Sequence, residues 1–161
     1  MKITDKINAG AGYILLGLLA LLGLCGIVVF IPTWVGDLTT EFLEFSSDAT
    51  VLQTLLTAPV IAFELVTLEV AYLLWLVHRD RMFSTTVFKW VRLLWLTSLG
   101  MAVSFMSIGA WLAGKNTLPP AILFVIAALS LFALAVSSIT NSLLALLAKA
   151  TNAKQDLEGV I

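Results

Sequence analysis

The chain has 161 residues, of which 60% are apolar and only 12% are charged, and its mean hydropathy is +1.04. A soluble domain of this length cannot bury so much apolar surface, so we expect lipid to surround most of the chain. The single cysteine (Cys25) and single histidine (His78) exclude an intramolecular disulfide, a cysteine metal cluster and a bis-histidine haem site within one chain.

Four apolar runs are each long enough to cross a membrane as an α-helix, which takes about 20 residues. They lie at about 9–31 (ended by Pro32), 55–77 (in an apolar run that begins at Val51), 93–113 and 121–148. Because the first run is too long for a signal peptide, we interpret it as a span. We therefore predict one all-α integral membrane domain of four transmembrane helices in an up-down-up-down bundle.

The basic residues fall on one side of the predicted spans. On that side are Lys2, Lys6, Arg79, Arg81, Lys89, Arg92, Lys149 and Lys154, whereas the other side has only Lys115. Cytoplasmic loops carry the excess of Lys and Arg, so we expect both termini, including a tail at 149–161, to be cytoplasmic. Trp34 and Trp111 then lie near the outer interface.

Two connecting segments are expected to lie on the membrane surface. In segment 37–48, apolar residues recur at helical spacing between acids, which predicts a short outer interfacial helix with Asp37 as its cap. On the inner side, Ser84 or Thr85 is a plausible cap for the next helix. We interpret Arg79, Arg81, Lys89 and Arg92 as lipid-headgroup or cytoplasmic anchors.

Small and polar residues predict the packing faces, because lipid supplies no hydrophobic force between spans. Gly10 and Gly17 are seven residues apart and share one face of the first span. In the fourth span a stripe with four-residue spacing is expected to face the bundle interior or another protomer; it comprises Ala133, Ser137, Asn141 and Ala145. The third span contributes Ser104 and Ser107.

Two carboxylates, Glu64 and Glu69, lie within the second span, where a charge costs about 3 kcal/mol or more. Five residues of helix turn them about 140° apart, so we expect different neighbours for them rather than an acid pair. Glu69 is predicted to meet Asn141, and Glu64 to reach the level of Ser104 or Ser107. Each acid is then a protonated packing contact, a site for a proton, cation or amine, or a docking point for a partner's basic residue.

The stretches HRDRMFSTTVFKWVRLLW and NSLLALLAKATNAKQDLEGVI carry a family resemblance. Over about residues 55–161 the chain resembles the small bacterial membrane proteins of domain of unknown function 2975, the YoaS-like proteins. The resemblance implies a four-span protein of the bacterial cytoplasmic membrane with no established catalytic residues. Members are often encoded beside a small helix-turn-helix regulator, which implies regulation or stress sensing.

The sequence contains no Walker motif, dinucleotide fingerprint, G-x-S-x-G or H-E-x-x-H. We therefore expect no enzyme, cofactor, metal or nucleic-acid partner. The leading hypothesis is an accessory or regulatory subunit that lies among membrane lipids and binds other membrane protein subunits or a second copy. The alternative is a small transporter or ion-coupled carrier in which Glu64 or Glu69 is the coupling carboxylate.

Overall fold

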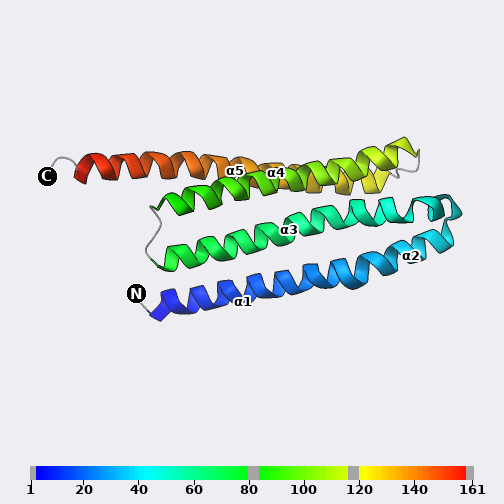
Figure 1. Cartoon of the computed structure of the whole chain (residues 1–161), viewed down its shortest axis with the longest axis horizontal. Helices are drawn as coiled ribbons and strands as arrows, with labels where there is room; N and C mark the ends of the chain where they lie inside the picture. The colour runs from blue at the N-terminus through cyan, green and yellow to red at the C-terminus, as the bar shows by residue number, and fades with distance from the viewer. Residues whose placement is uncertain (1–2, 80–83, 116–119, 159–161) are drawn as a thin grey trace.

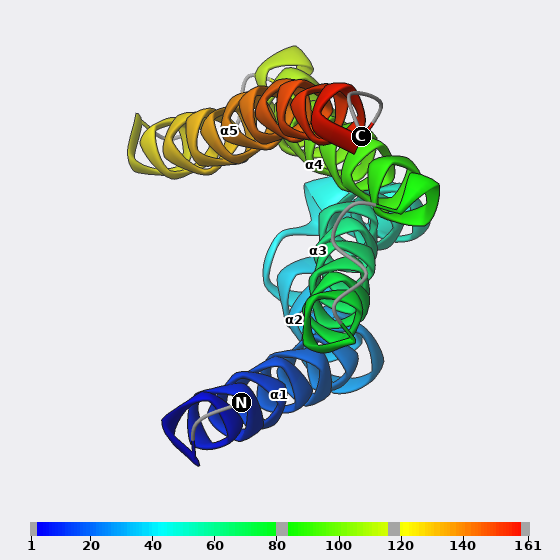
Figure 2. The same ribbon diagram turned by 90° about the vertical axis from the view of Figure 1, so that its left-hand side faces the viewer.

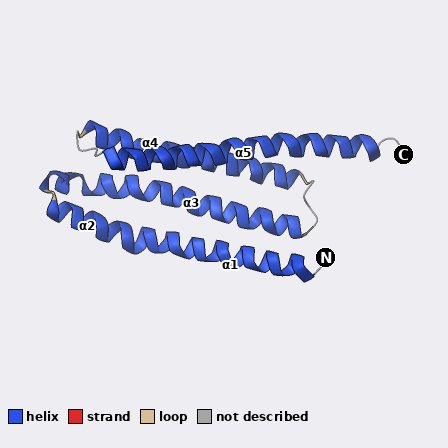
Figure 3. Ribbon diagram, turned by 180° about the vertical axis from the view of Figure 1, so that it is seen from behind, coloured by secondary structure: helices blue, strands red, loops and turns tan. Residues whose placement is uncertain are grey.

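The computed structural model describes residues 3–79, 84–115 and 120–158, and these residues contain helices and no strand (Figure 3). The elements are α1 (Ile3–Cys25), the π-helix η1 (Gly26–Phe30), α2 (Ile31–Glu41), the 3₁₀-helix η2 (Leu43–Asp48), α3 (Ala49–His78), α4 (Thr85–Gly114) and α5 (Pro120–Glu158). Four helical segments are long and apolar enough to cross a membrane: Gly10–Glu41, Phe45–His78, Thr86–Gly114 and Pro120–Thr151. The predicted all-α fold with four spans is confirmed.

The long helices lie antiparallel and side by side in chain order. α1 packs on α3, α3 on α4, and α4 on α5 (Figure 1). Seen from the end, they form an open, curved row with α1 and α5 at its two extremes (Figure 2). The up-down-up-down order is confirmed, and α1 begins at the same end of the row at which α5 ends. The side of the membrane on which this end lies stays a prediction.

The first helix continues through Pro32, where the sequence predicts its end. Pro32 has no N–H to donate, and a proline inside a helix normally breaks the bonding ladder. Here η1 precedes it, with the Ile31 N–H bonded to the Gly26 carbonyl, and the Thr33 hydroxyl lies 2.6 Å from the Val29 carbonyl and 3.0 Å from that of Phe30. A π-turn and a threonine hydroxyl are ways in which membrane helices compensate for a proline. The helix therefore runs on to Glu41.

The segment predicted as one interfacial helix at 37–48 is divided in two. Residues up to Glu41 belong to α2, Phe42 is extended, and η2 follows. Asp37 lies inside α2, so the prediction that it caps a helix is wrong. Leu38 instead packs against a cluster formed by Ile31, Val35 and Leu52.

The turn at η2 is also bound to the far end of α4. The ring of Phe45 lies 6.1 Å from that of Trp111, and Lys115 forms a 2.5 Å ion pair with Asp48. Lys115 also lies 5.8 Å from the centre of the Trp111 ring. These contacts hold η2 and the last turn of α4 together at the end of the row opposite the chain termini.

A heptad seam joins α5 to α4. The buried residues of α5 alternate steps of four and three; they are Ile126, Ser130, Ala133, Ser137 and Thr140. Ala133 and Ala102 are both 0% exposed and pack with Met101. The Ser137 hydroxyl donates to the Trp95 carbonyl across the interface at 3.3 Å.

The prediction that the small-residue stripe on α5 faces another protomer stays a prediction, and the prediction that it faces the bundle interior is right for Ala133 and Ser137 and wrong for Asn141 and Ala145, which are exposed. The cause is geometric. Each step of four residues advances about 40° beyond a full turn, so a stripe at this spacing leaves the interface. Alternating four and three keeps the mean step at about 3.5 residues and the seam on one side.

Candidate functional site

The two carboxylates within the apolar helices, Glu64 and Glu69, belong to α3, which lies between α1 and α4 (Figure 2). Glu69 faces α4 and is 4% exposed. Its Oε1 accepts a 2.8 Å hydrogen bond from the Thr97 hydroxyl, whose oxygen also lies 3.0 Å from the Leu93 carbonyl. Its Oε2 is buried with no hydrogen-bond partner in the structure. Glu69 thus has one satisfied and one unsatisfied oxygen.

The predicted contact between Glu69 and Asn141 is wrong. Asn141 is exposed on α5, and α4 lies between α5 and α3. Matching the depth of two residues in the membrane does not show which helices are neighbours. Thr97 was missed for that reason, although consecutive antiparallel helices usually pack together.

Glu64 faces the opposite neighbour, α1. Gly23 is buried there, and a Cβ at residue 23 would overlap Oε1 of Glu64 and contact its Cδ and Cγ. The carboxyl group therefore fills the space that a side chain at position 23 would occupy. Its Oε1 is buried and has no hydrogen-bond partner. Only glycine at position 23 leaves room for this arrangement.

The sequence predicts that Glu64 reaches the level of Ser104 or Ser107. In the structure Glu64 meets neither serine. The hydroxyls of those serines donate to the carbonyls of their own helix, to Gly100 and Val103, each at 2.9 Å. This is the usual way in which a helical serine satisfies its hydroxyl without a neighbour. The Glu64 side chain instead lies in the notch at Gly23. In the sequence, Gly23 is only one of several glycines in the first span.

The two carboxylates thus lie on opposite sides of α3, and the prediction that they have different neighbours is confirmed. This separation excludes an adjacent acid pair of the kind that shares a proton or flanks a scissile bond. In the described part of the chain, no group of three or more His, Cys, Asp or Glu side chains is placed to hold a metal ion.

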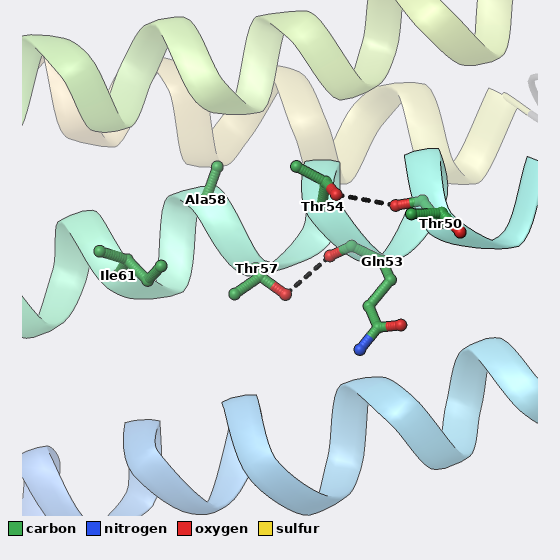
Figure 4. A pocket seen from close by; sticks show the side chains of 6 residues that line it. All are labelled: Thr50, Gln53, Thr54, Thr57, Ala58 and Ile61. Carbon is green, nitrogen blue, oxygen red and sulfur yellow. Dashed lines mark hydrogen bonds between the residues drawn. The ribbon is translucent and has the colours of Figure 1, made fainter.

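A hollow of about 320 Å³ lies along the first turns of α3 (Figure 4). It is lined by Thr50, Gln53, Thr54, Thr57, Ala58 and Ile61. The hydroxyls of Thr54 and Thr57 donate to the carbonyls four residues earlier, at 2.8 and 2.7 Å. A second hollow, of about 450 Å³, lies over η1 and its flanking helices. Neither is lined by Glu64 or Glu69.

The predicted anchors lie around the connection between α3 and α4. Arg79, Lys89 and Arg92 are exposed, whereas Arg81 lies outside the described residues. Ser84 stands at the N-cap position of α4, as predicted, but its hydroxyl makes no capping bond; its carbonyl accepts from the Val87 N–H at 3.0 Å. Tyr72, which the sequence analysis passed over, contacts the rings of both Trp75 and Trp90.

The notch at Gly23 can be tested by a double-mutant cycle. Gly23→Ala should destabilise the protein by about 1–3 kcal/mol because the Cβ displaces the Glu64 carboxyl. In a Glu64→Ala background the same change should be neutral or slightly stabilising, since alanine favours a helix over glycine. The free energy of unfolding in mixed micelles is the measurement, and Gly17→Ala, with nothing near its Cβ, is the control. Effects that add to within about 0.5 kcal/mol would disprove the contact.

The partner of Glu69 can be tested with Thr97→Val. Loss of the hydroxyl leaves a buried carboxyl oxygen unpaired, and we expect a cost of about 1–3 kcal/mol in the free energy of unfolding. Thr54→Val is the matched control, because its exposed hydroxyl bonds only to its own helix. Equal costs for the two variants would show that the bond from Thr97 to Glu69 contributes nothing.

Comparison with known proteins shows to which protein family the chain belongs. Neither the curated proteins nor the solved structures gave a match. The model of one protein family, described as "Protein of unknown function (DUF2975)", matches residues 33–161, from α2 to the end of the chain. This range contains α3, α4 and α5 whole, together with Glu64, Glu69 and Thr97, while Gly23 precedes it. The chain, with four helices of membrane-spanning length and its carboxylates on opposite sides of α3, belongs to the DUF2975 family.

Proposed function

We propose that this protein is a non-enzymatic accessory or regulatory subunit that binds another membrane protein, or a second copy of itself, through the faces of its helices. The observation that carries the proposal is that α1, together with the start of η1, has two glycine faces. Gly12, Gly23 and Gly26 face α3, where added Cβ atoms would meet Leu74 at 3.2 Å, the Glu64 carboxyl, and Val60 at 3.9 Å. Gly10 and Gly17 are exposed, and nothing lies within 4 Å of a Cβ at either position.

The second face points away from the rest of the chain. Five residues from Gly12 to Gly17 correspond to about 140° of rotation, so the two sets lie on nearly opposite sides of the helix. A glycine inside a helix costs roughly 0.5–1 kcal/mol relative to alanine. Packing on α3 accounts for this cost at Gly12 and Gly23, but no contact among the described residues accounts for it at Gly10 and Gly17.

A partner helix would account for it. Small residues let two helix backbones approach closely, which is a main source of helix association in lipid. The open row supports this proposal, because α1 lies at its extreme and packs against the rest of the chain on one side only (Figure 2). Under the proposal α1 binds α3 with one face and the partner with the other.

The proposal includes a location in the bacterial cytoplasmic membrane with both termini inside. It is supported by the charges of the described residues. Arg79, Lys89, Arg92 and Lys149 lie toward the end of the row where α1 begins, whereas Lys115 at the opposite end is paired with Asp48. An excess of basic residues marks the cytoplasmic side of a membrane protein.

The test is partner recovery from native membranes. The chain carries a C-terminal tag, is extracted gently, and its companions are quantified by mass spectrometry. Gly10→Leu with Gly17→Leu should lower the recovery of the companion about tenfold or more, because leucine side chains keep a partner backbone away. Gly100→Leu in α4 is the matched control, since Gly100 is also exposed with nothing within 4 Å but has no second glycine seven residues away on its face. Unchanged recovery in the α1 variant would refute docking on this face.

The second candidate is a small ion-coupled carrier. It is favoured by one observation: Glu64 and Glu69 each have a buried carboxyl oxygen without a hydrogen-bond partner. Intramembrane acids of this kind mark proton and ion pathways in many transporters. Their separation across α3 counts against a single shared site.

Flux in proteoliposomes separates the two candidates. If the protein is a carrier, Glu64→Gln or Glu69→Gln should abolish proton- or cation-driven uptake while the protein stays folded. If the protein is an accessory subunit, wild-type vesicles show no flux. In the recovery experiment, both glutamine variants then still bring down the partner. Wild-type vesicles without uptake would end the carrier hypothesis, and a folded Glu64→Gln, Glu69→Gln double variant with full uptake would show that neither glutamate is the coupling carboxylate.

A further inference from the structure

An aromatic ladder joins α3 to α4 near the end of the row where the termini lie. The rings of Tyr72 and Trp75 stack at 5.5 Å with an interplanar angle of 28°. Tyr72 also contacts Trp90 of α4, with 4.4 Å between ring centres. Three rings thus form one continuous apolar surface across two helices. Trp and Tyr are the residues that favour the level of the lipid headgroups.

Basic groups flank this ladder on both helices. The Arg79 guanidinium lies 4.3 Å from the centre of the Trp75 ring, on the α3 side. On the α4 side, Lys89 adjoins Trp90 in the chain and Arg92 follows within a turn; both are exposed. In residues 3–79, 84–115 and 120–158, none of the three forms an ion pair. Lys115, by contrast, is already paired with Asp48 at the other end.

We propose that this corner, formed by Tyr72, Trp75, Arg79, Lys89 and Trp90, binds the phosphate of an anionic phospholipid. A guanidinium stacked on an indole keeps its N–H edges free, and those edges match a phosphate bidentately. The ring holds the guanidinium in one place. Lys89 supplies a second positive charge on the α4 side.

The surface next to the cations suits a lipid rather than a free phosphate. Leu96 lies one turn beyond Arg92 on the same face of α4 and is 48% exposed; Leu93 is 43% exposed. Exposed leucines beneath a cationic rim fit acyl chains attached to the bound headgroup. Unspecific snorkelling of lysine and arginine stems would need neither the ring under Arg79 nor a particular headgroup.

The test uses the full chain in neutral detergent and counts retained lipids by native mass spectrometry, with phosphatidylglycerol and phosphatidylcholine supplied in equal amounts. The wild type should retain phosphatidylglycerol in preference. Arg79→Gln should weaken that binding about fivefold, the usual effect of one basic residue at a membrane surface. Trp75→Leu keeps the net charge but removes the platform, and should weaken it about two- to fivefold. Arg79→Lys, which also keeps the charge, should weaken it measurably.

Two matched controls define the site. Trp34→Leu alters a tryptophan that is 43% exposed and has no ring contact among the described residues, and Lys115→Gln removes a charge at the other end. Neither should change phosphatidylglycerol binding. The proposal fails if Trp75→Leu and Arg79→Lys both bind as the wild type does, or if Lys115→Gln weakens binding as much as Arg79→Gln.

Soluble glycerol phosphate is the last arm of the test. At millimolar concentration it should not displace phosphatidylglycerol, because it lacks acyl chains for the exposed leucines. Complete displacement would show that the corner binds a free phosphate compound instead, and would overturn the assignment to a lipid. Circular dichroism of each variant confirms its helices, and if Trp75→Leu loses them, Arg79→Lys decides the result alone.

Discussion

The structure depends on the fact that lipid supplies no hydrophobic force between helices that cross it. What joins the helices must therefore be close approach and polar contact. Each interface of the row shows one or both. α1 meets α3 where Glu64 lies over Gly23, α3 meets α4 where Thr97 donates to Glu69, and α4 meets α5 where Ala102 and Ala133 are fully buried. The two acids thus each lie at an interface between neighbouring helices.

The same constraint links the open row to function. A chain whose helices pack only in sequence order leaves the outer faces of its first and last helices to other molecules. Most of those faces are apolar and suit lipid. The exposed glycines of α1 suit a helix better than they suit acyl chains, and the aromatic and basic corner of α3 and α4 suits a charged headgroup. These features favour a protein that works through what it binds in the membrane.

Hydropathy and helical period were sufficient to predict the number of spans, their order, and the divergence of Glu64 and Glu69. They could not predict which residues face which neighbour. Asn141 lies on α5, which does not contact α3 in the residues that the structure describes, and the packing order selects Thr97 of α4 instead. The first helix continues through Pro32 because a π-turn and the Thr33 hydroxyl compensate for the proline. The rule that a proline ends a helix does not include this local compensation. The buried seam of α5 was predicted correctly only at Ala133 and Ser137. The prediction used a constant step of four residues, whereas the seam alternates steps of four and three as in a heptad.

The most direct test of the account is photo-crosslinking from α1 in native membranes. A photoreactive residue at position 17 should give one discrete adduct with a protein, because that glycine lies on the face with nothing against it. The same residue at position 12, beside Leu74, should crosslink within the chain. If position 17 yields only lipid adducts while position 12 behaves as expected, α1 has no protein partner, and the function proposed for this face is wrong.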